Sequence, residues 1–348
     1  PWGLRALLGY DRQLCSEILG ALAGEVIRSL KWRAKRALGL TSIKDAHTGT
    51  VTVVQRVDSS LRLNVHFHLL ALDGVYVHQA DGALVWHSLS TPTRAEVQDV
   101  AARTARCIQG ILRAHGRSLD PALQTVDEPD RFAQDQPALA ACYAAAAQGV
   151  SLAGDRAGQP SLRLMLSCDP PEQTPGDLPD EPVAEVGGVN LHAKVVIDGR
   201  DRERVERLVR YITRPALSEQ RLQRLEDGRV QLTLKSPWRD GTRAFVFEPF
   251  DLIARLLAAV PLPRFHRLRH HGVLAPHSQL RSAVAPQPPE FEDPIKAPAS
   301  GDQRELFEPA PDPNQAPPYR KPWAWLLRHV FLKDVSHCPR CGGPMRFR

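Results

Sequence analysis

Two histidines on one face of a predicted strand are the residues whose spacing most clearly suggests chemistry. His66 and His68 flank a phenylalanine in the run Leu61–Leu72, where apolar and polar side chains alternate at first. Because side chains on a strand point alternately to its two faces, both imidazoles point to the same polar face. They would supply two ligands of a metal site. The same pattern also fits two histidines on a solvated strand that binds no metal.

The third metal ligand has three candidates. Gln55 is our first choice because it lies on the preceding predicted strand, although alternation groups it with Val51 and Val53. Asp58 is a better oxygen ligand for a hard cation but also suits a turn, and His192 lies on a later strand. A structural role is the simpler interpretation of each. Two imidazoles and one oxygen ligand suit Mg²⁺ or Mn²⁺, and imidazole shifts the preference toward Mn²⁺.

A tyrosine on a downstream basic helix is the candidate nucleophile. Asp201 is expected to open this helix and Pro215 to end it. Tyr211 falls on the side of the helix that carries several arginines, Arg207 and Arg214 among them. The other side is an apolar stripe that we expect to be buried: Val205, Leu208, Val209 and Ile212.

A phenol among guanidinium groups is suited to attack a phosphate. The nearby cations favour the phenolate and neutralise the charge that develops on phosphorus. The bland alternative is a tyrosine at the edge of a core. Together with a metal that polarises a scissile phosphate, such a tyrosine would produce a 5′-phosphotyrosine link and a free 3′-OH. Rejoining would then need no nucleotide cofactor, because the covalent intermediate keeps the phosphoester energy.

An α+β fold is predicted to position these residues, with a central antiparallel sheet that carries the histidine pair. The helix of Tyr211 would pack so that the phenol faces the metal. Helical patterns cover 3–40 and 93–149, and a further helix is expected over 251–259. The other predicted elements are strands 51–54, 61–72, 74–77 and 189–197, an acidic Pro-rich loop 169–185, and a hairpin of 229–235 with 243–247.

Four regions are expected along the 348 residues. A basic helical segment, 1–50, precedes a catalytic domain, 51–282. A Pro-rich linker, 283–322, leads to a C-terminal tail, 323–348. In this tail Cys338 and Cys341 form half of a zinc knuckle, so they either bind Zn²⁺ with ligands from elsewhere or stay an unfilled half-site.

Basic charge is concentrated in the second half of the chain. The whole chain has 45 Lys+Arg and 39 Asp+Glu, whereas the stretch Arg202–Arg281 has 16 Lys+Arg and 8 Asp+Glu. We expect single-stranded DNA to bind there. A solvated surface with one buried tryptophan is the alternative. The candidate DNA-binding residues are Arg207, Lys235, Trp238, Arg239, Arg264, Arg267 and Arg269, with His270 and His271 nearby.

Composition also bounds the compartment. No run of about eighteen apolar residues predicts a membrane span. The start, Pro1–Arg5, has no signal-peptide pattern and no initiating Met. Four of the six cysteines are scattered, which favours reduced thiols. We therefore expect a cytoplasmic, nucleoid-associated bacterial protein.

Several segments resemble the transposases of the insertion-sequence-91 group and the related insertion-sequence common-region elements. The similar segments, in order, are Leu63–Tyr76, Arg210–Leu217, Lys235–Thr242, His270–His277 and Cys338–Gly343. The resemblance extends over most of the chain, from about residue 5 to 345. It implies a His-hydrophobic-His endonuclease that moves DNA by a rolling-circle-like, single-stranded route.

The resemblance also implies roles for single residues. His66 and His68 match the metal-binding pair, Tyr211 matches the nucleophile, and Arg214 lies where a basic residue accompanies it and would contact phosphate. Two-tyrosine members carry another tyrosine at the position of Arg207, so this chain resembles single-tyrosine relatives. The N-terminal Cys/His zinc-binding region that is common in the family has no counterpart before Tyr10.

Three other functions compete with a transposase. A replication initiator or a relaxase would use the same chemistry. An inactive remnant would bind DNA without cutting it. An unrelated metal phosphoesterase would need more Asp and His ligands than this chain arranges.

Overall fold

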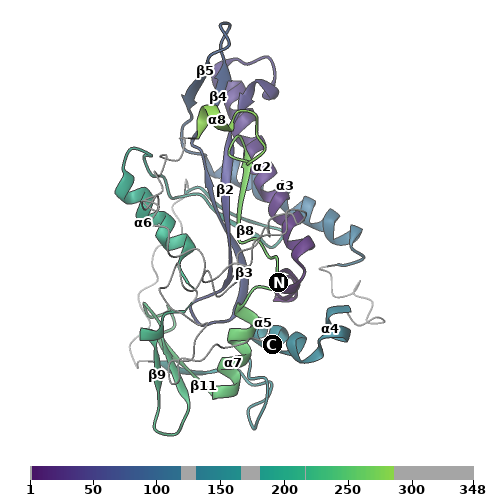
Figure 1. Cartoon of the computed structure of the whole chain (residues 1–348), viewed down its shortest axis with the longest axis vertical. Coiled ribbons are helices and arrows are strands. Elements are labelled where there is room, and N and C mark those ends of the chain that lie inside the picture. The colour runs from purple at the N-terminus through teal and green to yellow at the C-terminus, as the bar shows by residue number, and fades with distance from the viewer. Residues whose placement is uncertain (1, 119–130, 166–180, 216, 286–348) are drawn as a thin grey trace, which may run out of the picture. The chain divides into compact units, whose positions relative to one another are not determined.

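The predicted α+β class is confirmed. The computed structural model describes residues 2–118, 131–165, 181–215 and 217–285, all within one compact unit that spans Pro1–Gln287. Helices and several antiparallel sheets make up this unit (Figure 1). Within the described ranges, no helix is both long enough and apolar enough to cross a membrane.

A three-stranded antiparallel sheet lies at the centre of the fold. It consists of β2 (Gly49–Val57), β3 (Leu63–Ala71) and β12 (Leu268–Gly272), in the order β12-β2-β3. Strands β2 and β3 form the long hairpin that runs vertically through Figure 1. This hairpin carries the two histidines, as the alternating pattern predicts.

A second sheet continues the hairpin at its open end. It contains β1 (Ala46–His47), β4 (Gly74–His78) and β5 (Leu84–Ser88), in the order β1-β4-β5. The chain passes from β1 into β2 and from β3 into β4, and the Thr48 hydroxyl donates to the Gly74 carbonyl at the junction (2.8 Å). We call the combined structure of β1, β2, β3 and β4 the ribbon.

Two N-terminal helices cover one face of the ribbon. They are α1 (Trp2–Tyr10) and α2 (Arg12–Leu38), where a single helix over 3–40 is predicted. The break occurs at Asp11, whose side chain caps α2 by accepting from the Leu14 amide (2.9 Å). Buried apolar side chains of both helices and the ribbon form the main core: Leu8, Leu14, Ile18, Leu19, Val54, Leu63 and Val65.

The Ala-rich region 93–149 is predicted to be helical, and its described residues form three helices, while residues 119–130 lie outside the described part of the chain. The helices are α3 (Arg94–Ala114), α4 (Arg131–Asp135) and α5 (Pro137–Gln148). A capping box of Thr93 and Glu96 begins α3. Tyr143 of α5 joins the main core, and α3 packs along α2.

The strand predicted over 189–197 is shorter than expected. Only β8 (Val189–His192) forms, and it pairs with β7 (Val183–Val186) in a two-stranded sheet that packs on α3. The pairing of β7 also corrects the end of the predicted loop 169–185, because residues 183–185 are strand. The earlier residues of that loop, 169–180, lie outside the described residues.

A four-stranded antiparallel sheet builds a second core. Its order is β6 (Leu162–Met165), β11 (Thr242–Phe247), β10 (Val230–Thr233) and β9 (Leu222–Arg224). The hairpin of β10 and β11 is predicted, whereas β6 and β9 are too short for a clear pattern. The predicted helix at 251–259 is α7 (Pro249–Ala259), which contributes Leu252 to this core.

The remaining elements are short or lie at the surface. Helix α6 (Arg202–Thr213) begins after Asp201, which caps it, and ends before Pro215, as predicted. Helix α8 (Arg281–Val284) occupies the first residues of the predicted linker, and the rest of that linker lies outside the described residues from 286 onward. The described residues also contain two 3-10 helices, η1 (Ile43–Asp45) and η3 (Glu219–Arg221).

Candidate active site

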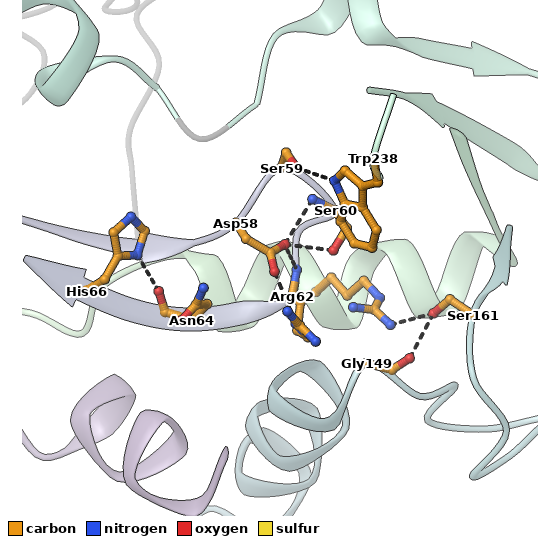
Figure 2. A network of polar contacts seen from close by, with 10 residues as sticks. Asp58, Ser59, Ser60, Arg62, Asn64, His66, Gly149, Ser161 and Trp238 are labelled. Carbon is orange, nitrogen blue, oxygen red and sulfur yellow. Dashed lines mark hydrogen bonds and ion pairs between the residues drawn. The ribbon is translucent and has the colours of Figure 1, made fainter. Parts of the chain in front are cut away.

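The two histidines lie side by side on β3, on the face of the ribbon turned away from α1 and α2. The centroids of their rings are 5.1 Å apart, and both side chains are half-buried. His66 Nδ1 lies 2.6 Å from the carbonyl oxygen of Asn64 (Figure 2). A carbonyl oxygen only accepts, so Nδ1 carries the proton and Nε2 presents its lone pair. In metal-binding histidines, the ring nitrogen that does not bind the metal commonly donates such a hydrogen bond, which fixes the orientation of the ring.

The environment of His68 favours its neutral form. Partial burial lowers the pKa of His68, and the neighbouring His66 and Arg214 lower it further. A histidine binds metal through an unprotonated ring nitrogen. His68 is therefore available as a ligand down to lower pH than an exposed histidine.

Gln55 shares the face of the two histidines. It lies directly opposite His66 in the register of β2 and β3, and Val53 lies opposite His68. The Gln55 Nε2 donates to the carbonyl of Ile212 (2.8 Å), which leaves Oε1 as the atom that could bind a cation. In the sequence, alternation groups Gln55 with apolar residues and so suggests that it faces the core. Val53 itself, however, lies on the same face as the two histidines, so this grouping does not exclude Gln55 as a ligand.

A β-bulge next to Gln55 separates the site face from the core. The register shifts between Gln55 and Val57, and Arg56 is directed into the protein. The Arg56 guanidinium donates to the carbonyls of Gly9, Ala258 and Ala259 and to the hydroxyl of Tyr143. These contacts fix the bulge against α1, α5 and α7, so Arg56 is a positioning residue, and no sequence pattern singles it out.

Asp58 and His192 do not join the histidine pair. The Asp58 carboxylate accepts from the amides of Ser60 and Arg62 and pairs with the Arg62 guanidinium, so it stabilises the turn between β2 and β3 (Figure 2). His192 lies on β8 in the separate hairpin packed on α3. Among the described residues, no group of three or more His, Cys, Asp and Glu could hold a metal ion. Gln55 is thus the candidate that the fold brings to the pair.

The tyrosine of α6 meets the histidines as the predicted packing requires. The ring centroids of His68 and Tyr211 are 6.1 Å apart. The Tyr211 side chain is 51% exposed, and the Arg214 guanidinium lies 4.4 Å from the centre of its ring. Two imidazoles, a phenol and a guanidinium therefore form one cluster at the surface.

The predicted burial of the apolar stripe on α6 is wrong for three of its four residues. Only Ile212 is buried, at 3% exposure, whereas Val209 is 40% exposed and Val205 and Leu208 are half-buried. The reason is that α6 contacts the ribbon chiefly through its last turn, where Gln55 bonds to Ile212. In Figure 1, α6 projects to the left of β2 and β3, on the side away from α2 and α3.

The turn between β2 and β3 is tied to the second core. The Arg221 guanidinium donates to the carbonyl of Ser59 (2.6 Å), and the Trp238 indole donates to the Ser59 hydroxyl (3.4 Å; Figure 2). Leu61 is fully buried in the second core and has a left-handed backbone (φ 60°). Burial in the second core compensates for the strained backbone of Leu61 and anchors the strand that carries the histidines. The sequence predicts that Leu61 is apolar but not that its backbone is left-handed.

The predicted DNA-binding residues are not all on one surface. Arg207, Lys235, Arg239, Arg264 and Arg267 are exposed. Trp238 is half-buried against Phe245 (5.1 Å between ring centroids), which fits the alternative that it packs in a core and does not bind DNA. Arg269 donates to the Ser16 hydroxyl of α2 (2.6 Å), so it lies on the covered face of the ribbon and leaves the candidate set. Cys338 and Cys341 lie outside the described residues.

Comparison with protein families gives a match over most of the described residues. The model of a family described as "Putative transposase" matches residues 49–282. No curated protein and no solved structure matches the chain. The matched segment begins with β2 and ends in α8, so it contains every residue of the cluster described above.

Proposed function

The chain belongs to the transposase family that its residues 49–282 match, and from this premise we propose that it nicks and rejoins single-stranded DNA through a covalent bond to Tyr211. The observation that carries the proposal is the row of rings in contact, with centroids 5.1 Å apart from His66 to His68 and 6.1 Å apart from His68 to Tyr211. A nucleophile beside a cation-binding pair is the arrangement that phosphoryl transfer requires.

A divalent cation fits the donor set on the ribbon. His66 and His68 would contribute one ring nitrogen each, and Gln55 would contribute Oε1, which suits Mg²⁺ or Mn²⁺. When bound, the cation polarises the scissile phosphate and offsets part of its charge. The Asn64 carbonyl holds the His66 ring with Nε2 available, so this ligand needs no reorientation.

The tyrosine supplies the covalent step. The phenolic oxygen of Tyr211 attacks phosphorus as its proton leaves, and the bond between phosphorus and the 3′-oxygen breaks. The products are a 5′-phosphotyrosine and a 3′-OH that has taken up a proton. Arg214 holds positive charge beside the ring and stabilises the phenolate and the charge that builds up on the phosphoryl oxygens. Attack by a 3′-OH on the phosphotyrosine reverses the step and rejoins DNA.

Exposed arginines around the tyrosine support a polyanionic substrate. Arg204, Arg207 and Arg210 lie on the exposed surface of α6, and Arg204 and Arg210 form local ion pairs with Asp201 and Glu206. Such side chains contact phosphates in a salt-dependent way without reading sequence. The resemblance to the insertion-sequence-91 group implies that this polyanionic substrate is single-stranded DNA. A replication initiator or relaxase would use the same residues.

A covalent-adduct assay tests the proposal. The protein is incubated with Mn²⁺ and 5′-labelled and 3′-labelled single-stranded oligonucleotides that carry candidate element ends, and denaturing gels are examined for protein-linked DNA. We expect an adduct that carries the 3′-side label and disappears in Tyr211→Phe. Tyr10→Phe is the matched control, because it removes the hydroxyl of a half-buried tyrosine of α1, on the other face of the ribbon, and should keep the adduct.

Three outcomes would contradict the proposal. Metal-dependent cleavage that survives Tyr211→Phe would favour a phosphoesterase. DNA binding without any adduct would favour a protein that binds DNA and does not cut it. Equal loss of the adduct in Tyr10→Phe would show that the loss in Tyr211→Phe does not identify the nucleophile. Transfer of the bound strand to a second oligonucleotide would separate joining from simple hydrolysis.

A further inference from the structure

A row of three rings crosses the small sheet at the other end of the ribbon. The register places His47 of β1 opposite Tyr76 of β4, and Tyr76 opposite Trp86 of β5. Residues that lie directly opposite one another share a face, so the three rings form one row, which we call the aromatic row. The ring centroids of Tyr76 and Trp86 are 4.9 Å apart, and Trp86 is 37% exposed. A wide aromatic surface is therefore open on this sheet.

Gly74 leaves the space into which the Trp86 ring packs. A Cβ at Gly74 would lie 2.6 Å from the Trp86 ring and 2.3 Å from the His87 carbonyl oxygen, so no side chain fits there. Gly74 is buried beneath the indole, which is supported from one side by backbone. This packing fixes the orientation of Trp86 and leaves more than a third of the residue exposed to solvent.

The aromatic row lies on the same face of the ribbon as the candidate active site. On β1 and β4 the side chains that pack on α2 are Ala46, Val75 and Val77, which form a cluster with Ala34. On β2 and β3 the corresponding side chains include Val54 and Val65. The alternate residues face the other way, and these are His47 and Tyr76 at one end and Gln55, His66 and His68 at the other.

The two ends of this face are separated by a distance that a short single strand can cover. Six residues along β1 and β2 separate His47 from Val53, the partner of His68, which corresponds to about 20 Å. About six nucleotides at a stacked spacing of about 3.4 Å span that distance. Leu274 approaches Gly49 between the two ends, so the strand would cross this apolar side chain.

The charge of this face suits a nucleic acid. The strand residues on it are His47, Gly74, Tyr76, His78, Leu84, Trp86 and Ser88, and none of these described residues has a carboxylate. The rings of His47 and His78 are 5.5 Å apart. Burial lowers the pKa of His47 first, and the charges of Lys31 and His78 lower it further, whereas the carboxylate of Asp45 raises it. One lysine and one aspartate therefore lie near the row, and a phosphate backbone would meet mainly neutral rings on the strands themselves.

We propose that the aromatic row stacks bases of the single-stranded DNA that extends from the active site. The inference rests on the proposed function, because it takes the substrate to be single-stranded. Every base has a π-face, so aromatic side chains on an open sheet bind bases with little sequence preference. Protein interfaces also use aromatic side chains, so the test below separates single-stranded DNA from a second copy of the chain.

Binding of oligo-dT to the full chain tests this proposal without any need for cleavage. In a Tyr211→Phe background, anisotropy of a labelled 30-nucleotide dT strand is measured at fixed salt. Trp86→Ala should weaken binding by about five- to hundredfold, and Trp86→Phe should retain most of it. Trp32→Ala is the matched control, because Trp32 has a similar exposure (41%) but lies on α2, and this variant should bind DNA like the parent. A duplex of equal length should not respond to Trp86→Ala.

A crosslinking measurement keeps the test decisive if Trp86→Ala fails to fold. In dT strands that contain 5-iododeoxyuridine, ultraviolet light should link the base to the peptide that carries Tyr76 or Trp86, and mass spectrometry identifies the site. Equal affinity of the Trp86→Ala and Trp32→Ala proteins, or crosslinks only elsewhere, would overturn the proposal. So would a change of oligomeric state in Trp86→Ala, which would assign the surface to a second copy.

The same samples separate this inference from the proposed function. If Tyr211-dependent adducts form while Trp86→Ala binds DNA normally, only the inference about the aromatic row fails. If no adduct forms with any strand while Trp86 still governs binding of dT, the covalent mechanism fails and the base-stacking surface stands.

Discussion

The strand that carries the histidines and the helix that carries the tyrosine are held in very different ways. Strand β3 has a fully buried Leu63, packs on α1 and α2, and begins after a turn anchored by Asp58. Helix α6 has one buried residue among its twelve, Ile212. The metal-binding half of the candidate site is therefore built into the core, whereas the nucleophile is attached through one helical turn.

This difference indicates a division of labour in the site. A metal-binding pair must be in place before substrate arrives, because ligand geometry determines affinity. A nucleophile that becomes linked to DNA has to follow the phosphate through cleavage and joining. A helix with few buried contacts can adjust at little cost in free energy. Four predictions test this contrast, in order of the expected effect.

Truncation of apolar side chains should affect the two elements unequally. Leu63→Ala removes a fully buried side chain of β3 and should lower the free energy of unfolding by about 2–5 kcal/mol. Val209→Ala, on the exposed side of α6, should change it by less than about 0.5 kcal/mol. Urea denaturation followed by circular dichroism measures both. Equal losses in the two variants would refute the contrast.

Removal of the buried guanidinium should loosen the strand next to Gln55. Arg56→Met keeps the length of the side chain but leaves the carbonyls of Gly9, Ala258 and Ala259 without their donor, and should cost at least about 2 kcal/mol of unfolding free energy. Arg103→Met removes only a surface ion pair with Asp99 and should cost less than about 1 kcal/mol. Thermal melting of both variants gives the comparison, and a stable Arg56→Met protein would show that the bulge is held by other contacts.

The single anchor of α6 should matter more for activity than for stability. Ile212→Ala should displace Tyr211 and slow adduct formation about 10- to 100-fold, since small displacements of reacting groups have effects of this size. The melting temperature should change far less than in Leu63→Ala. Single-turnover adduct assays measure the rate. An unchanged rate would mean that DNA itself positions the helix.

The turn that joins β2 and β3 should contribute a smaller, local effect. Asp58→Ala removes the acceptor for two backbone amides and the partner of Arg62, and should cost about 1–2 kcal/mol. Asp227→Ala, in an exposed turn beside Arg229, is the control and should stay within about 0.5 kcal/mol. If Asp58→Ala instead abolished binding of Mn²⁺ in a calorimetric titration while the protein stayed folded, Asp58 would have to be reconsidered as a ligand.

Local patterns predicted much of the fold because they reflect local physics. The alternation from Leu61 to Leu69 depends only on strand geometry, and β3 follows it. Asp201 and Pro215 mark the ends of α6 because caps and prolines act on neighbouring backbone groups. The short strands β6 and β9 escaped prediction because three or four residues carry no clear period. The stripe on α6 was misjudged because amphipathicity does not reveal which elements a helix meets.

The candidate site shows the same boundary between local and tertiary information. Local pattern was enough to predict that His66 and His68 share a face and that Tyr211 lies on a basic helix, and the resemblance connected them. The three-dimensional fold was needed to show that Gln55 lies opposite His66, that Tyr211 reaches His68, and that Arg269 faces α2. This is because side-chain direction along one element follows from backbone geometry. Cross-strand register, bulges and the docking of a helix instead arise from contacts between residues far apart in the chain.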